Sequence, residues 1–495
     1  MDVSAFEHHL TSPQGHGHRP GHGHTVTALG GACGDEVTFS IAVEGDRVTD
    51  AGFTVRGCGA TAAAASAAVT LVRDSPVLEA ARIGPAQIAD ELGGLSPAKR
   101  HAADVAAEGL ARALGAAVRA DARLPANPDA ALVAMSGGVD SAVAAHLCAA
   151  EGPAVAVTLE LWADAENDAE RSCCSASAVA QARALAHSMG LAHMTIDLRA
   201  EFRAGVVDPF IAGHAAGETP NPCVGCNGHV RLDAMLELAD RLGCAILATG
   251  HYARVAEAGD DRGPLLRAAA DPAKDQTYML SALSAASLAR LRFPLGDRHK
   301  TAVRRMAAEA GLPVAATPDS QDLCFIAGTS RERFLARHGD IGDAPGEIVD
   351  RQGTVLGTHA GQHRFTVGQR RGIGIHAEEP LYVLDKDAAT GRVTVGPREA
   401  LRTERVTIRA ARLHRDGARV DRVKLRYRAR PLRARVVGEP AEGRHRELAL
   451  QLQDAVDGAA PGQLACLMDG DLVVGWGTIS RPAAETVLGP TLQGR

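Results

Sequence analysis

Apolar and polar residues change their spacing several times along the chain, and each spacing predicts a different kind of element. Between residues 37 and 57, two strand-like runs flank an EGD turn, which predicts a hairpin. Alanine-rich stretches at 59–75 and 96–120 have high helix propensity, and the second opens with Ser96 and Pro97, a typical helix start. Residues 25–120 are therefore expected to form a small α+β unit.

From residue 131, short apolar runs alternate with helical segments. Strands are expected at 131–135, 155–162, 193–198 and 244–251, and helices at 139–152, 175–190 and 232–243. This alternation is typical of βαβ units and predicts a doubly wound parallel sheet. After about residue 335, the pattern changes to short strands and glycine turns, which predict an antiparallel barrel; its strands are expected at 405–413, 422–436, 445–452 and 471–479.

These changes divide the 495 residues into six regions. The first 24 residues contain the low-complexity run QGHGHRPGHGH and are expected to be a disordered tail, whose histidines could bind a stray divalent ion. The remaining regions are an α+β unit at 25–120, a proline-punctuated linker at 121–130, an α/β domain at 131–334, a small central domain at 335–401 and the barrel at 402–485.

Composition narrows the functional classes. A net charge of -6 gives no general affinity for nucleic acid, so any RNA contact requires a local basic patch. No apolar run approaches the roughly 18 residues of a membrane span, and the N-terminus lacks a signal-peptide pattern. We therefore expect a cytoplasmic protein without a membrane partner, whose ten cysteines are ligands, nucleophiles or core thiols rather than disulfides.

The stretch AMSGGVDS joins a predicted strand to a predicted helix. Its glycines allow a close approach to an anion, and the helix N-terminus favours negative charge. Two serine hydroxyls add donors, and Asp140 is a candidate ligand for Mg²⁺. The GK[ST] ending of a Walker A loop is absent, and the alternative is an ordinary glycine turn. The expected nucleotide contacts are Ala134, Met135, Ser136, Gly137, Gly138, Val139, Asp140 and Ser141.

The loop resembles the pyrophosphate loop of ATP-pyrophosphatases, which cleave ATP between the α- and β-phosphates and adenylate a substrate oxygen. Further stretches follow in order: CCSASAVAQAR, GETPNPCVGCN, ATGHYAR, KDQTYML, DSQDLCFI and GQHRFTVGQRRGIGI. From residue 131 to about 480, they closely resemble the bacterial tRNA-specific 2-thiouridylases, the MnmA family. The resemblance implies ATP contacts at Leu159 and Gly250 as well.

This resemblance also implies roles for cysteines. The family's reaction adenylates the C2 oxygen of a uridine, and a sulfur nucleophile then displaces AMP; a thiolate or persulfide is the competent form. Cys226 matches the family's nucleophile and Cys324 the carrier of a persulfide, with a buried core thiol as the alternative for each. The core is the expected place of Cys148, Cys244 and Cys466, whereas Cys173 and Cys174 fit a family motif without a chemical role.

Cys223 departs from well-known members of the family, which carry an Asp at this position. Two interpretations stay open. Cys223 is either a bystander beside a persulfide mechanism, or it binds a [4Fe–4S] cluster together with Cys226 and Cys324, leaving one iron open.

A basic stretch at 419–435 holds eight Lys or Arg residues and one Asp. Alternation along one strand would place most of these charges on one face. Such a face suits contact with RNA phosphates; the alternative is a charged, exposed edge strand that resists aggregation. The resemblance favours tRNA, with the target wobble uridine flipped out of the stack. The tRNA contacts that it implies are Asn221, Pro222, Cys223, His251, Lys274, Asp275, Gln276, Arg426, Tyr427 and Gln463.

The N-terminal unit resembles NifU/IscU-type iron–sulfur scaffolds through ACGDEV, VRGCGATAAAAS and LSPAKRHAADVA. Cys33, Asp35, Cys58 and His101 match the metal-binding positions, but Ala102 replaces the third cysteine. The unit is expected to bind an iron–sulfur cluster or Zn²⁺ at these positions. A degenerate domain that docks a cysteine desulfurase is the alternative to an active scaffold. Either would act as a tethered module that raises the effective concentration of sulfur.

We therefore expect ATP-dependent 2-thiolation of the wobble uridine of tRNA, with ATP and Mg²⁺ as cofactors. The expected sulfur donor is a cysteine desulfurase or a sulfur-relay protein. The alternatives are a small-molecule ligase of the ATP-pyrophosphatase type and a non-enzymatic iron–sulfur carrier.

Overall fold

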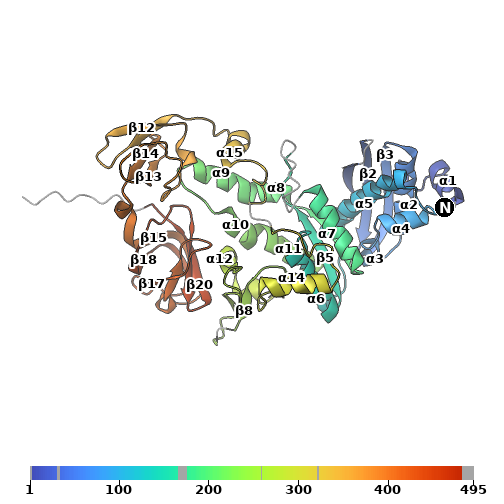
Figure 1. Ribbon diagram of the computed structural model, residues 1–495. Helices are drawn as coiled ribbons and strands as arrows, with labels where there is room; N and C mark the ends of the chain where they lie inside the picture. Colours follow the sequence, from blue (N-terminus) through green and yellow to red (C-terminus); the bar gives the residue numbers. More distant parts are fainter. Residues whose placement is uncertain (1–2, 31–33, 165–174, 258, 320–322, 482–495) are drawn as a thin grey trace, which may run out of the picture.

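The computed structural model describes residues 3–30, 34–164, 175–257, 259–319 and 323–481. The N-terminal unit lies at one end of the molecule, the parallel-sheet domain in the middle, and the central domain and the barrel at the other end (Figure 1). The expected multidomain architecture is confirmed. No helix in the described ranges has the length and apolar character needed to cross a membrane.

The N-terminal unit is an antiparallel sheet in the order β1-β2-β3, covered by helices. Alternate side chains of β2, among them Val37, Phe39 and Ile41, are buried in one core with α2 and α5. The predicted hairpin and both predicted helices are present. The elements are α1 (Val3–Thr11), β1 (His24–Gly30), β2 (Asp35–Glu44), β3 (Arg47–Arg56), α2 (Gly59–Val72), α3 (Val77–Ala80), α4 (Pro85–Glu91) and α5 (Arg100–Asp121).

Residues 3–24 are not a disordered tail, and that prediction is wrong. Helix α1 packs on α2, where the buried His9 ring lies 2.9 Å from the Ser66 hydroxyl. Gly15 has a φ of 78°, a left-handed conformation that glycine adopts readily. The resulting turn lets His16 pack edge-on against Phe53. The histidines of this region therefore include packing groups, which a composition argument does not detect.

The middle domain is a five-stranded parallel sheet in the order β10-β7-β4-β5-β6. The chain changes direction at β4, so a crevice is expected beyond the carboxyl ends of β4 and β7, where such domains bind ligands. Strand β4 begins before the predicted residue 131, which shortens the predicted linker. The strands are β4 (Asn127–Ala134), β5 (Ala154–Glu160), β6 (Ala192–Asp197), β7 (Cys244–Thr249) and β10 (Leu291–Arg292).

Helices cover this sheet and continue beyond it toward the barrel (Figure 1). Two short π-helical segments, η2 and η3, interrupt them near the C-x-x-C pair. The helices are α6 (Val139–Glu151), α7 (Ala176–Ser188), α8 (Arg199–Phe202), η2 (Arg203–Val207), α9 (Asp208–Ala215), α10 (Pro222–Gly225), η3 (Cys226–Arg231), α11 (Leu232–Arg241), α12 (Thr277–Leu280), α13 (Ala285–Leu288), α14 (Lys300–Glu309) and α15 (Arg331–Gly339).

The N-terminal unit packs directly on the edge strand β6 and is not joined to the middle domain by a linker alone. The His193 N–H donates to the Ala81 carbonyl over 2.8 Å, and Arg119 donates to the Asp197 carbonyl over 3.0 Å. A Cβ at Gly115 of α5 would lie 2.0 Å from a carbonyl oxygen of β6, so glycine permits this approach. One apolar core continues across both domains. The unit thereby covers a sheet edge with unpaired backbone groups.

The central domain is a four-stranded sheet in the order β12-β11-β14-β13, and β15-β18-β17-β16-β19-β20 closes into a barrel through pairing of β15 with β20. The hairpin β8–β9 of the middle domain pairs with β20 and extends the barrel sheet. The strands are β8 (Arg254–Ala256), β9 (Leu265–Arg267), β11 (Gly346–Val349), β12 (Val355–His359), β13 (Tyr382–Asp387), β14 (Arg392–Gly396), β15 (Arg402–Leu413), β16 (Arg422–Lys424), β17 (Leu432–Val436), β18 (Gly443–Asp457), β19 (Leu464–Asp469) and β20 (Leu472–Ile479).

The basic stretch at 419–435 is two strands joined by a turn, so the expected single strand with one charged face is wrong. Pro431 stands just before β17 and has no N–H to donate to a strand ladder. Lys424 of β16 is buried and pairs with Asp275 at 3.1 Å. The exposed basic residues of the stretch are Arg422, Arg426, Arg428, Arg430, Arg433 and Arg435.

Candidate active site

The predicted pyrophosphate loop lies between the end of β4 and the start of α6. The Ser141 hydroxyl accepts the Ser136 N–H at 3.1 Å and donates to the Gly138 carbonyl at 3.0 Å. Gly137 has a φ of 75°, and a Cβ there would lie 2.8 Å from the Ala178 carbonyl oxygen. A glycine turn closed in this way at a helix N-terminus suits a phosphate group.

Two further predicted nucleotide contacts lie beside this loop. Gly250 follows β7, and a Cβ there would approach the Ser141 nitrogen to 2.8 Å, so glycine allows the two loops to meet. Leu159 is a buried residue of β5, the neighbour of β4. The fold therefore gathers the predicted ATP residues at the carboxyl ends of β4, β5 and β7.

An ion network joins the loop to two other motifs. The Lys300 ammonium donates to both Asp140 oxygens, at 2.7 and 2.8 Å, and lies 2.8 Å from Asp319. Asp319 also accepts from Lys274 at 2.6 Å and from Arg304 at 2.8 Å. Burial opposes ionisation of Asp319, but hydrogen bonds from Lys274 and Lys300 lower its pKa to about 2. The SGGVDS, KDQ and DSQDLC motifs thus share one charged cluster.

Sequence reasoning did not single out Lys300, Arg304 or Tyr252. The Tyr252 hydroxyl donates to Asp140 at 2.8 Å, and burial together with Asp140 raises the pKa of Tyr252. Tyr252 belongs to the ATGHYAR motif, which was a usable signal. Lys300 is only 8% exposed, and a buried lysine requires a partner; its burial comes from the tertiary fold and leaves no mark in the local sequence.

The two predicted catalytic cysteines border the same group of helices. Cys226 is buried and begins η3, which contacts α8 and η2. Cys324 is half-buried and packs against the core that contains Cys226. The ring of its neighbour Phe325 packs on Phe202 of α8 and Phe210 of α9. The fold thereby brings together two motifs that lie far apart in the sequence.

Cys223 lies in α10, one turn before Cys226, and is half-buried. The Asn221 side chain caps this helix by accepting the Cys223 N–H at 3.0 Å. Pro222 occupies the first helical turn, where its missing N–H has no intrahelical partner to lose. These three residues therefore form one short capped turn.

Apart from Cys58 of the N-terminal unit, the remaining cysteines divide into two groups. Burial raises the pKa of Cys148 and Cys244 to about 11 and of Cys466 to about 12. All three are buried, as predicted for core thiols. Cys33, Cys173 and Cys174 lie outside the described residues.

The loop at 217–221, just before the C-x-x-C pair, is fastened to the barrel. The Gln463 amide donates to the Thr219 carbonyl at 2.6 Å, and the Thr219 N–H donates to the Pro461 carbonyl at 2.9 Å. Arg409 of β15 pairs with Glu218 at 2.9 Å. Gln463, a predicted tRNA contact, is therefore engaged inside the protein.

Several other predicted tRNA contacts also have internal partners. Asp275 binds Lys424, and the side-chain amide oxygen of Gln276 accepts the Tyr252 backbone N–H at 2.9 Å. The His251 ring lies 2.8 Å from the Thr249 hydroxyl, and burial, with a smaller effect of Arg231, lowers the pKa of His251 to about 3. These side chains organise the carboxyl edge of the sheet.

Arg426 and Tyr427 lie on the turn between β16 and β17. Arg426 is exposed, although one of its nitrogens donates to the Gly458 carbonyl at 3.3 Å. The Tyr427 ring lies 6.3 Å from the Tyr278 ring. Burial raises the pKa of Tyr427. Tyr278 belongs to α12, which contacts both α10 and η3, so this turn of the barrel lies near the helices that carry the C-x-x-C pair.

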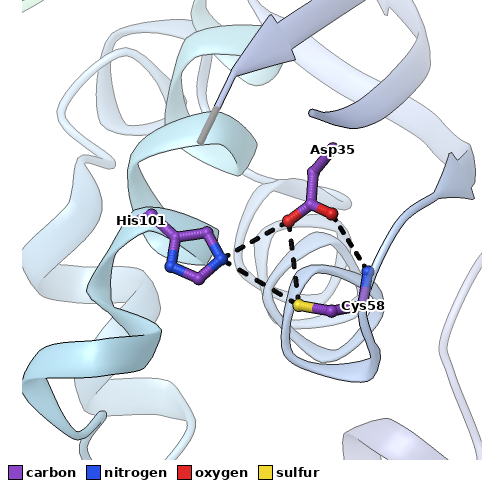
Figure 2. Close-up of side chains that lie close together, drawn as sticks. All are labelled: Asp35, Cys58 and His101. Carbon is purple, nitrogen blue, oxygen red and sulfur yellow. Dashed lines mark hydrogen bonds and ion pairs between the residues drawn. The ribbon is translucent and has the colours of Figure 1, made fainter. Parts of the chain in front are cut away.

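The N-terminal unit holds a second cluster, in which Asp35, Cys58 and His101 point toward one another (Figure 2). Their ligand atoms all lie within 4.8 Å of one another. Hydrogen bonding to Cys58 raises the pKa of His101; burial opposes ionisation of Cys58, but bonds with Thr61 and His101 lower its pKa. A carboxylate, a thiolate and an imidazole are suitable donors for Zn²⁺ or iron. Ala102, in place of a third cysteine, is buried and offers no ligand.

Comparison with known proteins covers almost the whole chain. Residues 4–120 match the NifU-like N terminal domain, 129–328 the tRNA methyl transferase HUP domain, 332–397 the tRNA methyl transferase PRC-barrel domain, and 400–479 the aminomethyltransferase beta-barrel domain. The bifunctional protein NifU/MnmA of Rubrobacter xylanophilus is 43% identical over 488 residues, which cover 96% of this chain and 97% of that protein.

Relatives without the N-terminal unit match the rest of the chain. The tRNA-specific 2-thiouridylase MnmA of Xanthobacter autotrophicus is 42% identical over 71% of this chain and 92% of its own length. The enzyme of the same name from Corynebacterium glutamicum is 42% identical over 70% and 98%. With these identities, and with the pyrophosphate loop and both cysteine motifs in one fold, the chain belongs to the MnmA family of tRNA-specific 2-thiouridylases, in the form that carries a NifU-like domain at its N-terminus.

Proposed function

We propose that this protein uses MgATP to activate the C2 oxygen of the wobble uridine of tRNA and that sulfur reaches C2 through Cys226 and Cys324. The observation that carries this proposal is the position of Lys300. It contacts Asp140 of the pyrophosphate loop and Asp319, which begins the segment that leads to Cys324. Nucleotide binding and sulfur delivery would therefore occur next to each other.

In the first step, the C2 oxygen attacks the α-phosphorus of ATP, and the bond to the β-phosphate breaks to release pyrophosphate. The glycine loop and the α6 N-terminus would hold the phosphates. Asp140 would hold Mg²⁺, which supplies charge neutralisation on the phosphates when it is bound. The Lys300 ammonium binds Asp140. When Asp140 holds Mg²⁺, this ammonium would bind a phosphate oxygen of ATP instead.

In the second step, the terminal sulfur of a Cys324 persulfide attacks C2, and AMP leaves with the former C2 oxygen. The Cys226 thiolate then attacks the Cys324 sulfur. The persulfide S–S bond breaks, its electron pair stays on the sulfur bound to C2, and a Cys226–Cys324 disulfide forms. An external thiol must reduce this disulfide, and a persulfide-bearing donor protein must reload Cys324.

Cys223 is the reason to keep a second mechanism. It lies one turn before Cys226 in α10, and with Cys324 it completes three thiol ligands of the kind that a [4Fe–4S] cluster uses. Such a cluster would deliver sulfur at its open iron. The persulfide mechanism needs only two of these cysteines, so the two mechanisms differ in what they require of Cys223.

The test is anaerobic purification of the full chain, with counts of iron, zinc and labile sulfide, followed by tRNA thiolation assays. Cys226→Ser and Cys324→Ser should abolish thiolation, whereas Cys223→Ser should retain much of it. Cys244→Ala, a change of a buried core thiol, is the matched control. Loss of both iron and activity in Cys223→Ser would favour the cluster and reject the persulfide route.

A ligase acting on a small molecule is the competing activity. The exposed arginines on the turn between β16 and β17, which lies near the helices of the C-x-x-C pair through the contact of Tyr427 with Tyr278, favour a polyanionic substrate. ATP cleavage to AMP and pyrophosphate should therefore be stimulated by tRNA. Stimulation by a metabolite in the absence of tRNA would reject the proposal.

The N-terminal cluster is proposed as a metal site, with Asp35, Cys58 and His101 as ligands and Cys33 as the candidate fourth. Zn²⁺ or iron would hold these side chains together, but the buried Ala102 argues against the usual three-cysteine scaffold. We also propose that the N-terminal unit docks a cysteine desulfurase or another sulfur donor in the cytoplasm. Measuring the metal content of Cys58→Ser and of wild type tests this ligand set: the variant should hold less metal.

A further inference from the structure

An arginine of the NifU-like domain reaches the end of a strand in the ATP domain. Arg112 of α5 donates through Nε to the Glu160 carboxylate at 2.9 Å, and a second guanidinium nitrogen also binds this carboxylate. Glu160 is the last residue of β5 and directly follows Leu159. It is only 5% exposed, and a buried carboxylate is strongly destabilising unless it is paired.

The pair belongs to a balanced charge cluster at the domain boundary. Arg112 also contacts Glu108 of its own helix at 3.0 Å, and Arg183 of α7 contacts Glu108 at 2.5 Å. Two guanidinium groups therefore face two carboxylates contributed by three elements. Loss of Arg112 would leave both carboxylates with one guanidinium, and Glu160 would lose its charged partner in the cluster.

The position of Glu160 gives this cluster a functional consequence. The carboxyl end of β5 borders the pyrophosphate loop, because β5 pairs with β4 in register up to Ala134. The Glu160 carbonyl also accepts the Leu198 N–H at 2.9 Å. Misplacement of the Glu160 side chain would shift the strand end that carries Leu159.

We propose that Arg112 is a positioning residue for the ATP site and that the NifU-like domain, besides any role in sulfur transfer, completes the nucleotide-binding half of the molecule. Arg112 does not touch the nucleotide. It acts by holding Glu160, and through it the backbone at Leu159, in place. This inference rests on the proposed use of ATP.

The test measures the dissociation constant of MgATP by calorimetry on the full chain without tRNA, together with the unfolding temperature. Arg112→Met should weaken ATP binding roughly tenfold, because a small misplacement at a site has a large effect. Arg112→Lys should retain part of the affinity. The double variant Arg112→Met/Glu160→Gln should regain affinity, because the unpaired charge is gone. Recovery of this kind would not occur if Arg112 only held the domains together.

Arg119→Met is the matched control, since Arg119 lies on the same helix and pairs with the exposed Glu201 at 2.5 Å. It should bind ATP like wild type. Unchanged affinity in Arg112→Met, or an equal loss in Arg119→Met, overturns the inference. If Arg112→Met does not fold, the affinities of Arg112→Lys and Glu160→Gln for MgATP decide. The inference is also overturned if Arg112→Lys binds MgATP like wild type while Glu160→Gln binds it more weakly. A wild type that does not bind ATP rejects the proposed function itself.

Discussion

Lys300 is the residue that joins the pyrophosphate-loop motif to the DSQDLC motif through a single side chain. Its ammonium binds Asp140 and Asp319, two carboxylates that belong to different motifs. Removal of this charge would leave Asp140 with the Tyr252 hydroxyl as its described partner. A group that neutralises charge next to a phosphate site contributes to transition-state stabilisation when it is held in place beforehand.

Lys300→Met should therefore lower kcat/KM for ATP by roughly 10²-fold. Arg304→Met is the control, because Arg304 contacts Asp319 and not Asp140; it should retain ATP binding and lose mainly the sulfur-transfer rate. Steady-state kinetics with tRNA, alongside pyrophosphate release, separates the two steps. Equal effects of the two substitutions on ATP affinity would contradict this assignment.

Buried histidines link stability to pH. Burial lowers the pKa of His214 to about 3, with smaller effects of nearby cations, whereas the unfolded value is 6.5. Between these values the unfolded chain binds a proton that the folded chain does not, so the free energy of unfolding falls as pH drops from 6.5 toward 3. His214→Leu should make this decline shallower in urea titrations at several pH values. His376→Leu, a change of an exposed histidine, serves as the control. If the free energy of unfolding of His214→Leu depends on pH as steeply as that of wild type, the linkage is refuted.

At the scale of elements, the loop at 217–221 connects the barrel to the C-x-x-C pair. Three contacts fasten it: Gln463 to the Thr219 carbonyl, the Thr219 N–H to the Pro461 carbonyl, and Arg409 to Glu218. Because α10 begins directly after this loop, the barrel controls where Cys223 and Cys226 lie. The barrel thus positions the proposed catalytic Cys226 in addition to offering a basic surface.

Gln463→Leu should lower kcat of thiolation about tenfold, because the loop loses one of its three contacts with the barrel, and should leave the affinity for tRNA unchanged. Gln451→Leu changes the same residue type on β18, away from the loop, and should have no effect. Filter-binding with tRNA and single-turnover thiolation give the two quantities. A loss of tRNA affinity with unchanged kcat would instead favour direct contact between Gln463 and tRNA.

For the whole molecule, the structure makes the NifU-like domain part of the folding unit. It covers the edge strand β6 and shares an apolar core with the ATP domain. A chain that starts at Ala122 should therefore unfold at a temperature lower by roughly 5 °C or more and aggregate through the uncovered edge. Differential scanning calorimetry against the full-length wild-type chain measures this effect. An equally stable and active truncated chain would show that the two domains are independent.

Local patterns determined much of this protein in advance. Two strand-like runs around an EGD turn predicted the hairpin at 37–57, and short apolar runs between helical segments predicted the parallel strands, since strands buried on both faces of a sheet are apolar along their length. Motifs predicted the candidate pyrophosphate loop, since a glycine turn before a helix suits an anion whatever lies around it. The same reasoning failed for residues 3–24 and for the basic stretch at 419–435, where contacts with distant residues decide the conformation.

The sequence by itself thus determined the fold class, the family and the two cysteine motifs, because each depends on neighbouring residues or on motifs that keep their order along the chain. Only the tertiary structure decided which distant charges share a partner: Lys300 between Asp140 and Asp319, and Arg112 on Glu160. It also decided that the N-terminal unit is packed and not tethered. The physical reason is that burial of a charge, and the partner this burial requires, arise only when segments far apart in the chain are brought together.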